Sequence, residues 1–359
     1  MAHRKIKMFN QEYRSTDNSG FDSLQLDKSA LISQPGRGEV LIKFHAVSLN
    51  YRDLCISRGE YSMPTKPDTV PVSDGAGEVT AVGEGVRVLK VGDRVSPNFI
   101  LDHLGGQLAE ESLKSALGGA IDGCLRQYGV YPAVSCVKIP HCLSYEEAAT
   151  LPCAALTAWN SLYGLADRKL EPGQTVLVQG TGGVALFGAQ FAIAAGARVI
   201  ITSSSNEKIA AVKKYLGEKN VCTINYRETP EWGKKAKELS HGGRGVNHIL
   251  EVGGEKTLPQ SLEALAFGGS IGIIGFVAGT DVSSSTGNGI TMQILMKNAN
   301  VRSVLIGSVE QFNAMNAAIE MHRIKPIVDK VFEFEDFTDA YEYLFSQKHV
   351  GKVVVKIPE

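Results

Sequence analysis

Apolar residues follow two different patterns along this 359-residue chain. In the first part, short apolar runs such as Val40 to Val47 alternate with turns that contain glycine. Short strands separated by such turns are typical of a small β-barrel. We therefore expect strands at residues 40–47, 74–79, 82–86 and 91–95, preceded by a hairpin of residues 5–9 and 24–27.

The later part of the chain alternates strand patterns with helix patterns. Each apolar, β-branched run is followed by a longer helical run, and this order predicts a doubly wound parallel sheet. The expected strands are 176–178, 198–202, 221–224, 246–252, 269–276 and 300–306. The expected helices are 186–195, 207–215, 230–239 and 257–265.

The remaining segments have weaker or more local signals. Ser144, with Glu147 three positions later, resembles a capping box and predicts a helix pair that reaches Tyr163 and breaks at Pro152. Residues 98–126 have no clear pattern and predict an extended loop with little regular structure. A helix at 309–321 and a strand–helix–strand tail at 328–359 complete the chain.

A glycine-rich turn stands at the start of the second pattern. Gly180-Thr181-Gly182-Gly183-Val184-Ala185 follows an apolar strand and opens an alanine-rich helix. In a strand–turn–helix–strand unit, such a turn places backbone N–H groups and the positive end of a helix against a pyrophosphate. The segment from Thr175 to Thr202 therefore predicts a dinucleotide site.

The end of the second strand of this unit bears on which dinucleotide binds. A site that prefers NAD usually has Asp or Glu there, about 20 residues past the first glycine. This chain has Thr202 to Ser205 instead, and its first carboxylate is Glu207. Hydroxyls followed by Lys208 can bind the 2′-phosphate of NADP, although the serines can also cap the next helix. Both interpretations can hold together, and we expect NADP.

Composition narrows the class of protein. The formal net charge is −1, from 37 basic and 38 acidic residues, so there is no electrostatic footprint for nucleic acid or an anionic membrane. The N-terminus lacks the apolar core of a signal peptide, and the six cysteines form no C-x-x-C pair. We expect a cytoplasmic enzyme that acts on a small molecule and binds neither nucleic acid nor membrane.

Four motifs in one order point to a family. The chain contains N-Y-x-D at residue 50, G-A-G-E-V-T-A-V-G-x-G-V at residue 75, L-P-C-A-x-L-T-A-W at residue 151 and then the nucleotide-binding unit. This arrangement resembles the medium-chain dehydrogenase/reductase superfamily, and within it the zinc-free branch that includes quinone oxidoreductases. The resemblance implies a GroES-like β-barrel catalytic domain at residues 1–150, completed by 308–359, and a Rossmann domain at 151–307.

The same resemblance shows which metal ligands are replaced. Zinc members use Cys, His and Cys, with a Glu that often follows the His. The first position falls at or beside Tyr51, Ser73-Asp74 replaces the His-Glu pair, and only Cys153 keeps a ligand type. One thiolate cannot build a catalytic zinc site. Cys124 is the only cysteine between residues 98 and 126, so the structural zinc lobe is also missing. We expect no metal.

The resemblance also implies the residues that contact the cofactor. Gly180, Gly182, Gly183 and Val184 should bind the pyrophosphate. The 2′-phosphate and the adenine ribose should lie near Ser203, Ser204, Lys208 and Tyr226. The nicotinamide should lie near Asn50, Thr157, Val252, Gly275 and Phe276, and Gly307 and Lys352 are further family-like positions near the cleft.

Candidate catalytic residues gather where the zinc ligands are replaced: Tyr51, Asp53, Ser73 and Cys153. Tyr51 can offer a hydroxyl to the substrate oxygen, or it can pack under the nicotinamide ribose or against the domain junction. Asp53 is expected to orient a neighbour rather than to donate a proton. Ser73 can line the site or form the turn before Gly75. Cys153 can be a buried small residue or face the substrate.

The resulting hypothesis is an NADPH-dependent, zinc-independent oxidoreductase that reduces a quinone, an enone or enal, or a carbonyl compound. An alcohol dehydrogenase or ketone reductase is one alternative, and a catalytically silent NADPH-binding protein of the same fold is another. In the family, the strand corresponding to Asn300 to Ile306 often pairs across a twofold axis. We therefore expect a homodimer.

Overall fold

The computed structural model describes residues 9–277, 279 and 289–359. It divides into two compact units: unit 1 comprises Met1–Cys153 with Ser308–Glu359, and unit 2 comprises Ala154–Gly307. Within the described residues, no helix combines the length and the apolar character needed to cross a membrane.

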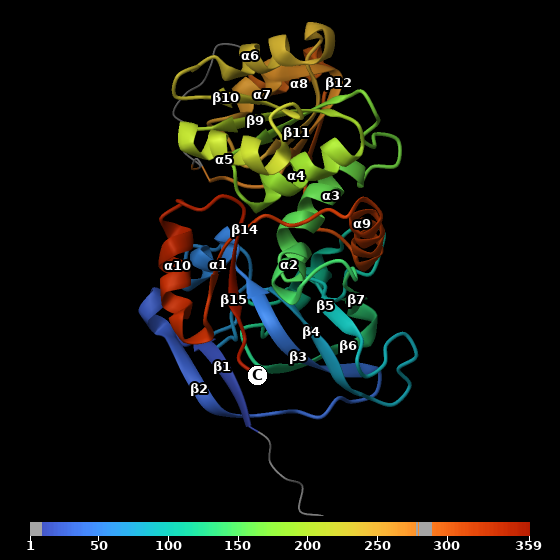
Figure 1. The fold of residues 1–359 in the computed structure, drawn as a ribbon, viewed down its shortest axis with the longest axis vertical. Coiled ribbons are helices and arrows are strands. Elements are labelled where there is room, and N and C mark those ends of the chain that lie inside the picture. Colours follow the sequence, from blue (N-terminus) through green and yellow to red (C-terminus); the bar gives the residue numbers. More distant parts are fainter. Residues whose placement is uncertain (1–8, 278, 280–288) are drawn as a thin grey trace, which may run out of the picture. The chain divides into compact units, whose positions relative to one another are not determined.

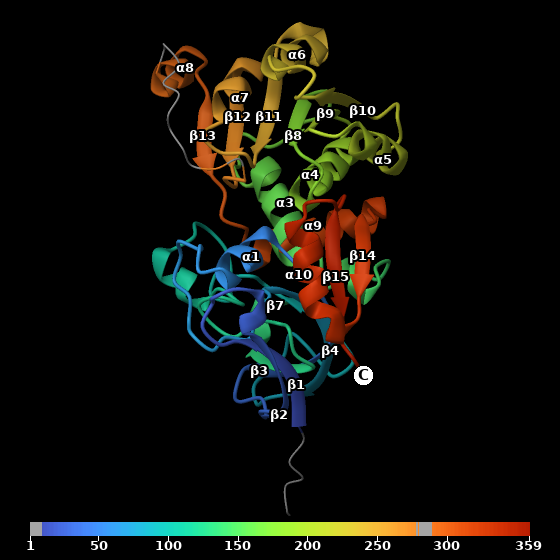
Figure 2. The ribbon, with the colours of Figure 1, turned by 90° about the vertical axis from the view of Figure 1, so that its left-hand side faces the viewer.

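Unit 1 is built on one sheet that mixes early and late parts of the chain. Its order is β14-β15-β3-β4-β5-β7, with β6 also paired to β3. Antiparallel pairing of β15 with β3 brings the C-terminal segment against the first long strand (Figures 1 and 2). The strands are β3 (Glu39–Ser48), β4 (Asp74–Val82), β5 (Arg94–Pro97), β6 (Tyr128–Pro132), β7 (Cys136–Lys138), β14 (Val328–Phe332) and β15 (Lys352–Lys356).

Helices and a separate hairpin complete unit 1. The helices are α1 (Tyr51–Ser57), α2 (Tyr145–Ala148), α9 (Val309–His322) and α10 (Phe337–Phe345). Short 3₁₀ turns occur at Phe21–Ser23, Glu110–Ser115, Ala133–Ser135 and Phe334–Asp336. The capping box at Ser144 is confirmed, because its hydroxyl accepts from the Glu147 N–H and the Glu147 carboxylate accepts from the Ser144 N–H. The predicted irregular stretch 98–126 holds only one of these 3₁₀ turns.

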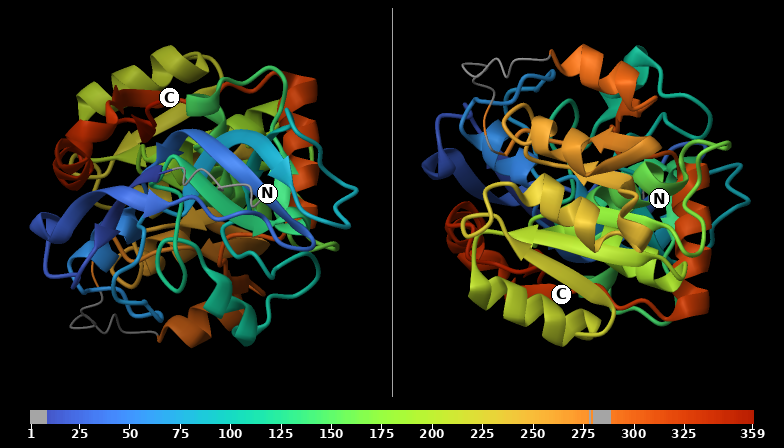
Figure 3. Two further views of the ribbon diagram at one scale, coloured as in Figure 1. Left: turned by 90° about the horizontal axis from the view of Figure 1, so that it is seen from below. Right: turned by 90° about the horizontal axis from the view of Figure 1, so that it is seen from above.

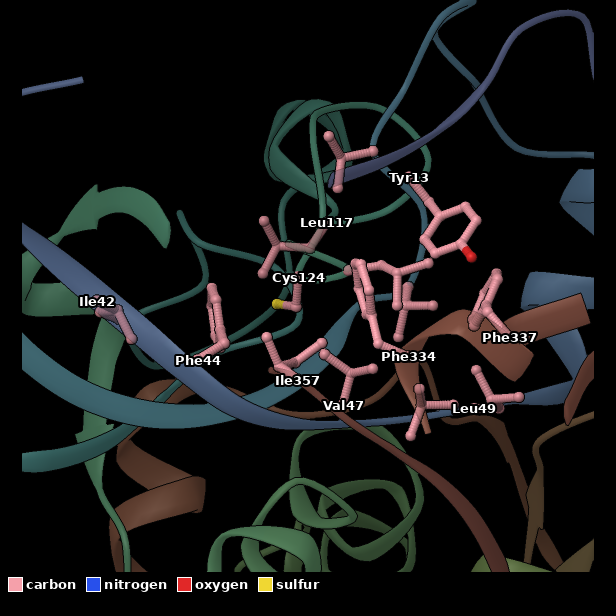
Figure 4. Close-up of a cluster of buried hydrophobic side chains, with 14 of the residues drawn as sticks. Tyr13, Ile42, Phe44, Val47, Leu49, Leu117, Cys124, Phe334, Phe337 and Ile357 are labelled. Atoms are coloured by element: carbon pink, nitrogen blue, oxygen red, sulfur yellow. The ribbon is translucent and has the colours of Figure 1, made fainter. Parts of the chain in front are cut away.

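The apolar core of unit 1 lies between β3 and the C-terminal segment. Figure 4 shows Phe44, Val47 and Leu49 of this cluster beside Phe334 and Ile357. Leu49, the residue after β3, is 1% exposed and comes directly before the N-Y-x-D motif. The core therefore fixes the backbone from which that motif begins.

Unit 2 is the predicted doubly wound parallel sheet. The strand order is β10-β9-β8-β11-β12-β13, and every neighbouring pair is parallel. The strands are β8 (Thr175–Gln179), β9 (Arg198–Ser203), β10 (Val221–Asn225), β11 (Val246–Glu251), β12 (Leu265–Ile273) and β13 (Asn300–Ser303). The order reverses between β8 and β11, where open α/β sheets bind ligands at the carboxyl ends of their strands.

Helices cover both faces of this sheet (Figures 1 and 3). They are α4 (Gly183–Ala194), α5 (Asn206–Leu216), α6 (Trp232–Leu239), α7 (Leu258–Ala264) and α8 (Ile290–Met296). A π-helical turn at Leu151–Ala155 leads into α3 (Leu156–Tyr163). Pro152 lies within this turn, so the predicted break of the helix pair is present, but α2 already ends at Ala148.

The predicted hairpin is present with different bounds, and one other predicted strand is wrong. The first hairpin strand is β1 (Phe9–Ser15), paired with β2 (Leu24–Leu31), whereas the prediction ended at residue 9 and its residues 5–8 lie outside the described residues. Val82 ends β4, and residues 83–86 form a turn rather than a strand. Gly83 explains this, because a Cβ added there would lie 1.7 Å from the Gly36 carbonyl oxygen. The chain therefore turns against the segment before β3.

Candidate active site

The glycine-rich turn joins β8 to α4 in unit 2. Gly180 has φ +78°, a left-handed conformation that favours glycine, and Gly182 is the N-cap residue of α4. A Cβ added at either glycine would meet no atom within 4 Å, so the space beside the turn is open. No side chain caps α4, whose first residues are Gly183 and Val184. This turn fits a pyrophosphate because it offers N–H groups and a positive helix end to an open space.

Hydroxyl groups surround the end of β9. Ser203 is 3% exposed, and its carbonyl accepts a 3.0 Å hydrogen bond from the Tyr226 N–H, which places Tyr226 beside it. Ser205 is the helix cap, because its hydroxyl accepts from the Lys208 N–H at 3.3 Å. Both interpretations of the serines therefore keep support: Ser205 caps α5, while Ser203 and Ser204 are not the capping residue. The nearest carboxylate in sequence, Glu207, accepts a hydrogen bond from the Ser205 hydroxyl at 2.5 Å.

The carboxyl ends of β11 and β12 bring three more predicted residues together. The Val252 carbonyl accepts from the Val277 N–H at 3.0 Å, and a Cβ added at Gly275 would lie 3.2 Å from the same oxygen. Phe276, which is 47% exposed, approaches Gly254, where an added Cβ would lie 3.3 Å from the Phe276 Cβ. Val252, Gly275 and Phe276 are therefore neighbours at the strand ends.

A buried carboxylate that the sequence analysis missed supports this edge. Glu251 is fully buried at the end of β11. Its oxygens accept hydrogen bonds from Gln179 Nε2 at 2.6 Å, Ser261 Oγ at 2.5 Å and Thr257 Oγ1 at 2.6 Å. The N–H groups of Gly253 and Gly254 donate at 2.9 and 3.1 Å. This network fixes the turn after β11 and joins it to the central strand β8.

Unit 1 holds a second buried polar cluster, at the start of α1. Asn50 is the N-cap residue, and its N–H donates to Asp53 Oδ2 at 2.8 Å. The Lys352 ammonium, at the start of β15, donates to Asn50 Oδ1 and to the Leu49 carbonyl, each at 2.6 Å. It also lies 3.9 Å from Asp74 Oδ2. The cluster therefore joins the end of β3 to the start of β15 and the start of β4.

The remaining predicted residues of unit 1 surround Asp74. The Ser73 hydroxyl donates to Asp74 Oδ1 at 2.8 Å, and the Cys153 N–H donates to Asp74 Oδ2 at 3.3 Å. Ser73 and Asp74 are both fully buried, and Ser73 forms a bend directly before β4. Tyr51 differs from this group because it is 43% exposed.

Burial governs the protonation of this cluster. Burial raises the pKa of Asp53 to about 6, although the adjacent Arg52 guanidinium opposes the shift. Burial also raises the pKa of Asp74, and Lys352 opposes it. Burial and then the Asp74 charge raise the pKa of the Cys153 thiol, and burial raises the pKa of Tyr51. Cys153 and Tyr51 are therefore neutral near pH 7.

A strained residue aims Ser73 and Asp74 into the cluster. Val72 has φ +69°, a conformation that β-branched residues rarely adopt. It is fully buried, and the Cys124 N–H donates to its carbonyl at 2.7 Å. The Cys124 thiol in turn lies 3.4 Å from the Ser73 carbonyl. Strained conformations persist where surrounding contacts impose them, and they concentrate at functional sites.

Arg52 is a further residue of this cluster that the sequence analysis did not select. Its guanidinium lies 4.5 Å from the Phe99 ring centroid and 5.0 Å from that of Tyr61. It lies 3.6 Å from Asp53 and donates to the Leu117 carbonyl at 3.0 Å. Its position between Tyr51 and Asp53, two residues that the sequence had selected, could have indicated that Arg52 belongs to the site. The sequence did not reveal the partners of its guanidinium.

Two predicted positions in unit 2 lie outside these groups. Thr157, on α3, is 2% exposed, and its hydroxyl is buried with no hydrogen-bond partner among the described residues. Gly307 is the last residue of unit 2 and follows Ile306, which has φ +58°.

The residues of the cluster do not fit a catalytic zinc ion. Among the described residues, no three His, Cys, Asp or Glu side chains are arranged to hold a metal. Ser73 is not a zinc ligand type, and the group beside Asp74 is the Lys352 ammonium. A cation of the protein itself therefore neutralises the carboxylate of this site.

Family models match both parts of the chain. The alcohol dehydrogenase GroES-like domain matches residues 36–141, and the zinc-binding dehydrogenase domain matches residues 183–321. A zinc-type alcohol dehydrogenase-like protein of Schizosaccharomyces pombe is 50% identical over 339 residues, covering 94% of this chain and 96% of that protein. The chain belongs to the medium-chain dehydrogenase/reductase superfamily. It is an oxidoreductase of that superfamily, whose members bind nicotinamide cofactors.

Two further relatives match nearly the whole chain. An acryloyl-coenzyme A reductase of Metallosphaera sedula is 31% identical and covers 90% of this chain and 93% of that enzyme. A solved structure of a putative alcohol dehydrogenase from Sinorhizobium meliloti superposes with a TM-score of 0.87 at 35% identity, over 98% of this chain and all of that one. The predicted GroES-like and Rossmann fold is confirmed.

Proposed function

We propose that this protein is an NADPH-dependent, zinc-independent reductase of conjugated carbonyl compounds: enones, enals or quinones. One observation carries the proposal. The resemblance places the zinc ligands at or beside Tyr51, at Ser73-Asp74 and at Cys153, and there the Asp74 carboxylate lies 3.9 Å from the Lys352 ammonium, which also donates to Asn50 Oδ1 at 2.6 Å. A conjugated acceptor is already electrophilic, so neutral hydrogen-bond donors can polarise it where a simple alcohol–ketone pair would rely on a metal.

NADPH is the hydride donor in this proposal. When bound, the cofactor supplies the hydride, and the protein supplies its orientation. Gly180, Gly182, Gly183 and Val184 hold the pyrophosphate at the open turn before α4. Ser203, Ser204, Lys208 and Tyr226 bind the 2′-phosphate and the adenine ribose. The absence of a carboxylate on β9 supports NADP over NAD, because a carboxylate there would repel the phosphate.

The remaining predicted residues act at the nicotinamide and the substrate. Thr157, Val252, Gly275, Phe276 and Gly307 orient the nicotinamide. Tyr51 offers a neutral, partly exposed hydroxyl to the substrate. Asp53 holds the Asn50 backbone, Ser73 orients Asp74, and Cys153 contributes a neutral thiol and the backbone N–H that binds Asp74.

The test mixes the protein with NADPH or NADH and each compound of a panel of acceptors. The fall in absorbance of the reduced nicotinamide measures the rate of reduction. Enones, enals and quinones should be reduced with NADPH faster than with NADH, and a chelator should leave the rates unchanged. Simple ketones, and alcohols with NADP⁺, should react poorly. Stoichiometric zinc with loss of activity on chelation would indicate an alcohol dehydrogenase instead. NADPH binding without turnover of any compound would indicate a catalytically silent protein.

We also propose the domain boundaries and the cellular location of the protein. Residues 1–150 with 308–359 form the catalytic domain, and 151–307 form the nucleotide-binding domain. All six cysteines are unpaired, which suits a cytoplasmic protein.

A homodimer is also part of the proposal. Strand β13 is the edge of the parallel sheet of unit 2, and the helix before it, α8, has exposed Met292, Leu295 and Met296. Pairing of β13 with its copy would cover the free edge. Light scattering at two protein concentrations should give the dimer mass, and a monomer at both would refute the pairing.

A further inference from the structure

Lys352 determines which way the Asn50 side-chain amide faces. The ammonium has only donors, so the atom 2.6 Å from it must be the Asn50 oxygen rather than the amide nitrogen. The amide N–H₂ group therefore faces away from Lys352. In most asparagines the hydrogen-bond network alone decides between the two orientations, and here a buried cation decides it.

Lys352 is itself held firmly. It is 4% exposed, and its N–H donates to the Ile327 carbonyl at 3.0 Å. Its ammonium also donates to the Leu49 carbonyl at 2.6 Å. The preceding residue, Gly351, has φ +92°, and a Cβ added there would lie 2.2 Å from the Ile327 oxygen. The lysine therefore has little freedom to release Asn50.

The amide nitrogen of Asn50 is buried and makes no hydrogen bond among the described residues. Asn50 is 8% exposed, and its Nδ2 is inaccessible to solvent. The amide also helps to lower the pKa of Asp74, so it lies near that carboxylate, although no hydrogen bond joins the two groups. An amide nitrogen carries two hydrogens, and Asp74 could take only one of them. A buried donor without an acceptor is destabilising, so we expect a ligand to supply the acceptor.

We infer that Asn50 Nδ2 donates a hydrogen bond to the carbonyl oxygen of the substrate, and that Lys352 is the positioning residue that fixes this donor. The inference rests on the proposed function. A hydride that adds to the β-carbon of an enone breaks the C=C π bond, and the electron pair moves to the oxygen as an enolate. The Asn50 N–H stabilises that negative charge without transferring a proton. The α-carbon then takes a proton from water, which completes the saturated ketone.

The experiment combines kinetics with a vibrational measurement on the full-length protein. Cyclohexenone labelled with ¹³C at its carbonyl is bound in the presence of NADP⁺, which cannot reduce it, and the C=O stretching band is recorded. A hydrogen bond lowers this frequency. We expect the band of the wild type to lie below that of Asn50→Ala. We also expect kcat/KM to fall about a hundredfold in Asn50→Ala, as for loss of one oxyanion donor, with the Kd of NADPH within about twofold.

Variants of Lys352 test the positioning role. Lys352→Met should raise the C=O frequency as Asn50→Ala does, because the freed amide can rotate, whereas Lys352→Arg should largely restore the wild-type band. Asn50→Asp keeps a good N-cap residue but removes the donor, so it tests the inference even if Asn50→Ala is unstable. Asn316→Ala is the control, because that asparagine is also buried but its Nδ2 already donates to the Lys138 carbonyl at 2.9 Å.

The outcomes separate this inference from the proposed function. An unchanged C=O band in both Asn50 variants overturns the inference, even if the wild type reduces enones rapidly. A loss of NADPH affinity that accounts for the whole kinetic effect also overturns it, because Asn50 would then bind the nicotinamide. A wild type that reduces no compound of the panel refutes the proposed function, while the band shift of bound cyclohexenone still decides whether Asn50 is the donor.

Discussion

Two buried carboxylate clusters, at Glu251 in unit 2 and at Asp53 in unit 1, differ in how completely their polar atoms are paired. Glu251 of unit 2 accepts hydrogen bonds from three side chains and two backbone N–H groups. Asp53 of unit 1 has one oxygen bonded to the Asn50 N–H, while its Oδ1 makes no hydrogen bond within the described part of the chain and lies 3.6 Å from the Arg52 guanidinium. A completed network needs nothing from a ligand and stabilises the fold, whereas an incomplete one leaves groups available for chemistry.

Among these predictions, the largest loss of stability is expected from Glu251→Ala. The substitution removes the acceptor that five donors share at the ends of β8 and β11. Gln179, Thr257 and the Gly253 N–H keep second acceptors, but the Ser261 hydroxyl and the Gly254 N–H lose theirs. We expect the free energy of unfolding to fall by about 3 kcal/mol or more, measured by urea denaturation. Glu255→Ala, in the exposed turn that follows, is the matched control and should change little. A loss below about 1 kcal/mol would show that the network is not structural.

The second prediction concerns the pH dependence of Asp53. Its pKa is raised from 3.8 to about 6, so its contribution to stability is fully present below pH 3.8 and is lost as the pH rises through about 6. Asp53→Asn stays neutral at every pH. The variant should therefore gain up to about 3 kcal/mol relative to the wild type between pH 4 and pH 8.

Urea denaturation of both proteins in the same buffers measures this difference. The wild type is the control at each pH. A difference between the two proteins that does not change with pH would mean that Asp53 is paired as completely as Glu251, and the contrast between the clusters would disappear.

A third prediction extends the contrast to backbone donors. The first turn of α4 has no side-chain cap, and a Cβ added at Gly182, whose φ is −80°, meets no atom. Gly182→Ala should therefore leave the free energy of unfolding nearly unchanged. It should weaken NADPH binding about tenfold, or about 1.4 kcal/mol, because the methyl group occupies the space of the pyrophosphate. Fluorescence titration measures the affinity, and unchanged binding would place the pyrophosphate elsewhere.

The sequence predicted the fold more fully than the site, for a physical reason. The strand and helix patterns of unit 2 are local, so β8, α4 and β9 were predicted close to their observed bounds. The cluster of unit 1 depends on contacts between Asn50 and Lys352, which are far apart in sequence and are brought together by the pairing of β3 with β15. The motif resemblance selected both residues but not the hydrogen bond between them.

The wrong strand prediction and the unpredicted role of Glu251 have the same cause, because both depend on contacts between distant parts of the chain. Residues 82–86 look like a strand in isolation, but the close approach of Gly83 to Gly36 turns the chain. Glu251 ends an apolar strand, and nothing nearby shows that it would be buried and paired by Gln179 and Ser261. Side chains whose role depends on partners from other strands cannot be selected from a local pattern.

The smallest changes in stability are expected when one serine of each cluster is replaced by alanine. Ser261→Ala removes the bond to Glu251 and the bond from Gln179, and Ser73→Ala removes the bond to Asp74. Each should lower the free energy of unfolding by about 1–2 kcal/mol. Their kinetics should differ: the Ser73 hydroxyl lowers the pKa of Asp74, so its loss should move the acidic limb of the activity profile to higher pH. Ser261→Ala should leave that limb in place, because Glu251 is paired with four other donors. Equal profiles for the two variants would mean that the cluster of unit 1 is structural as well.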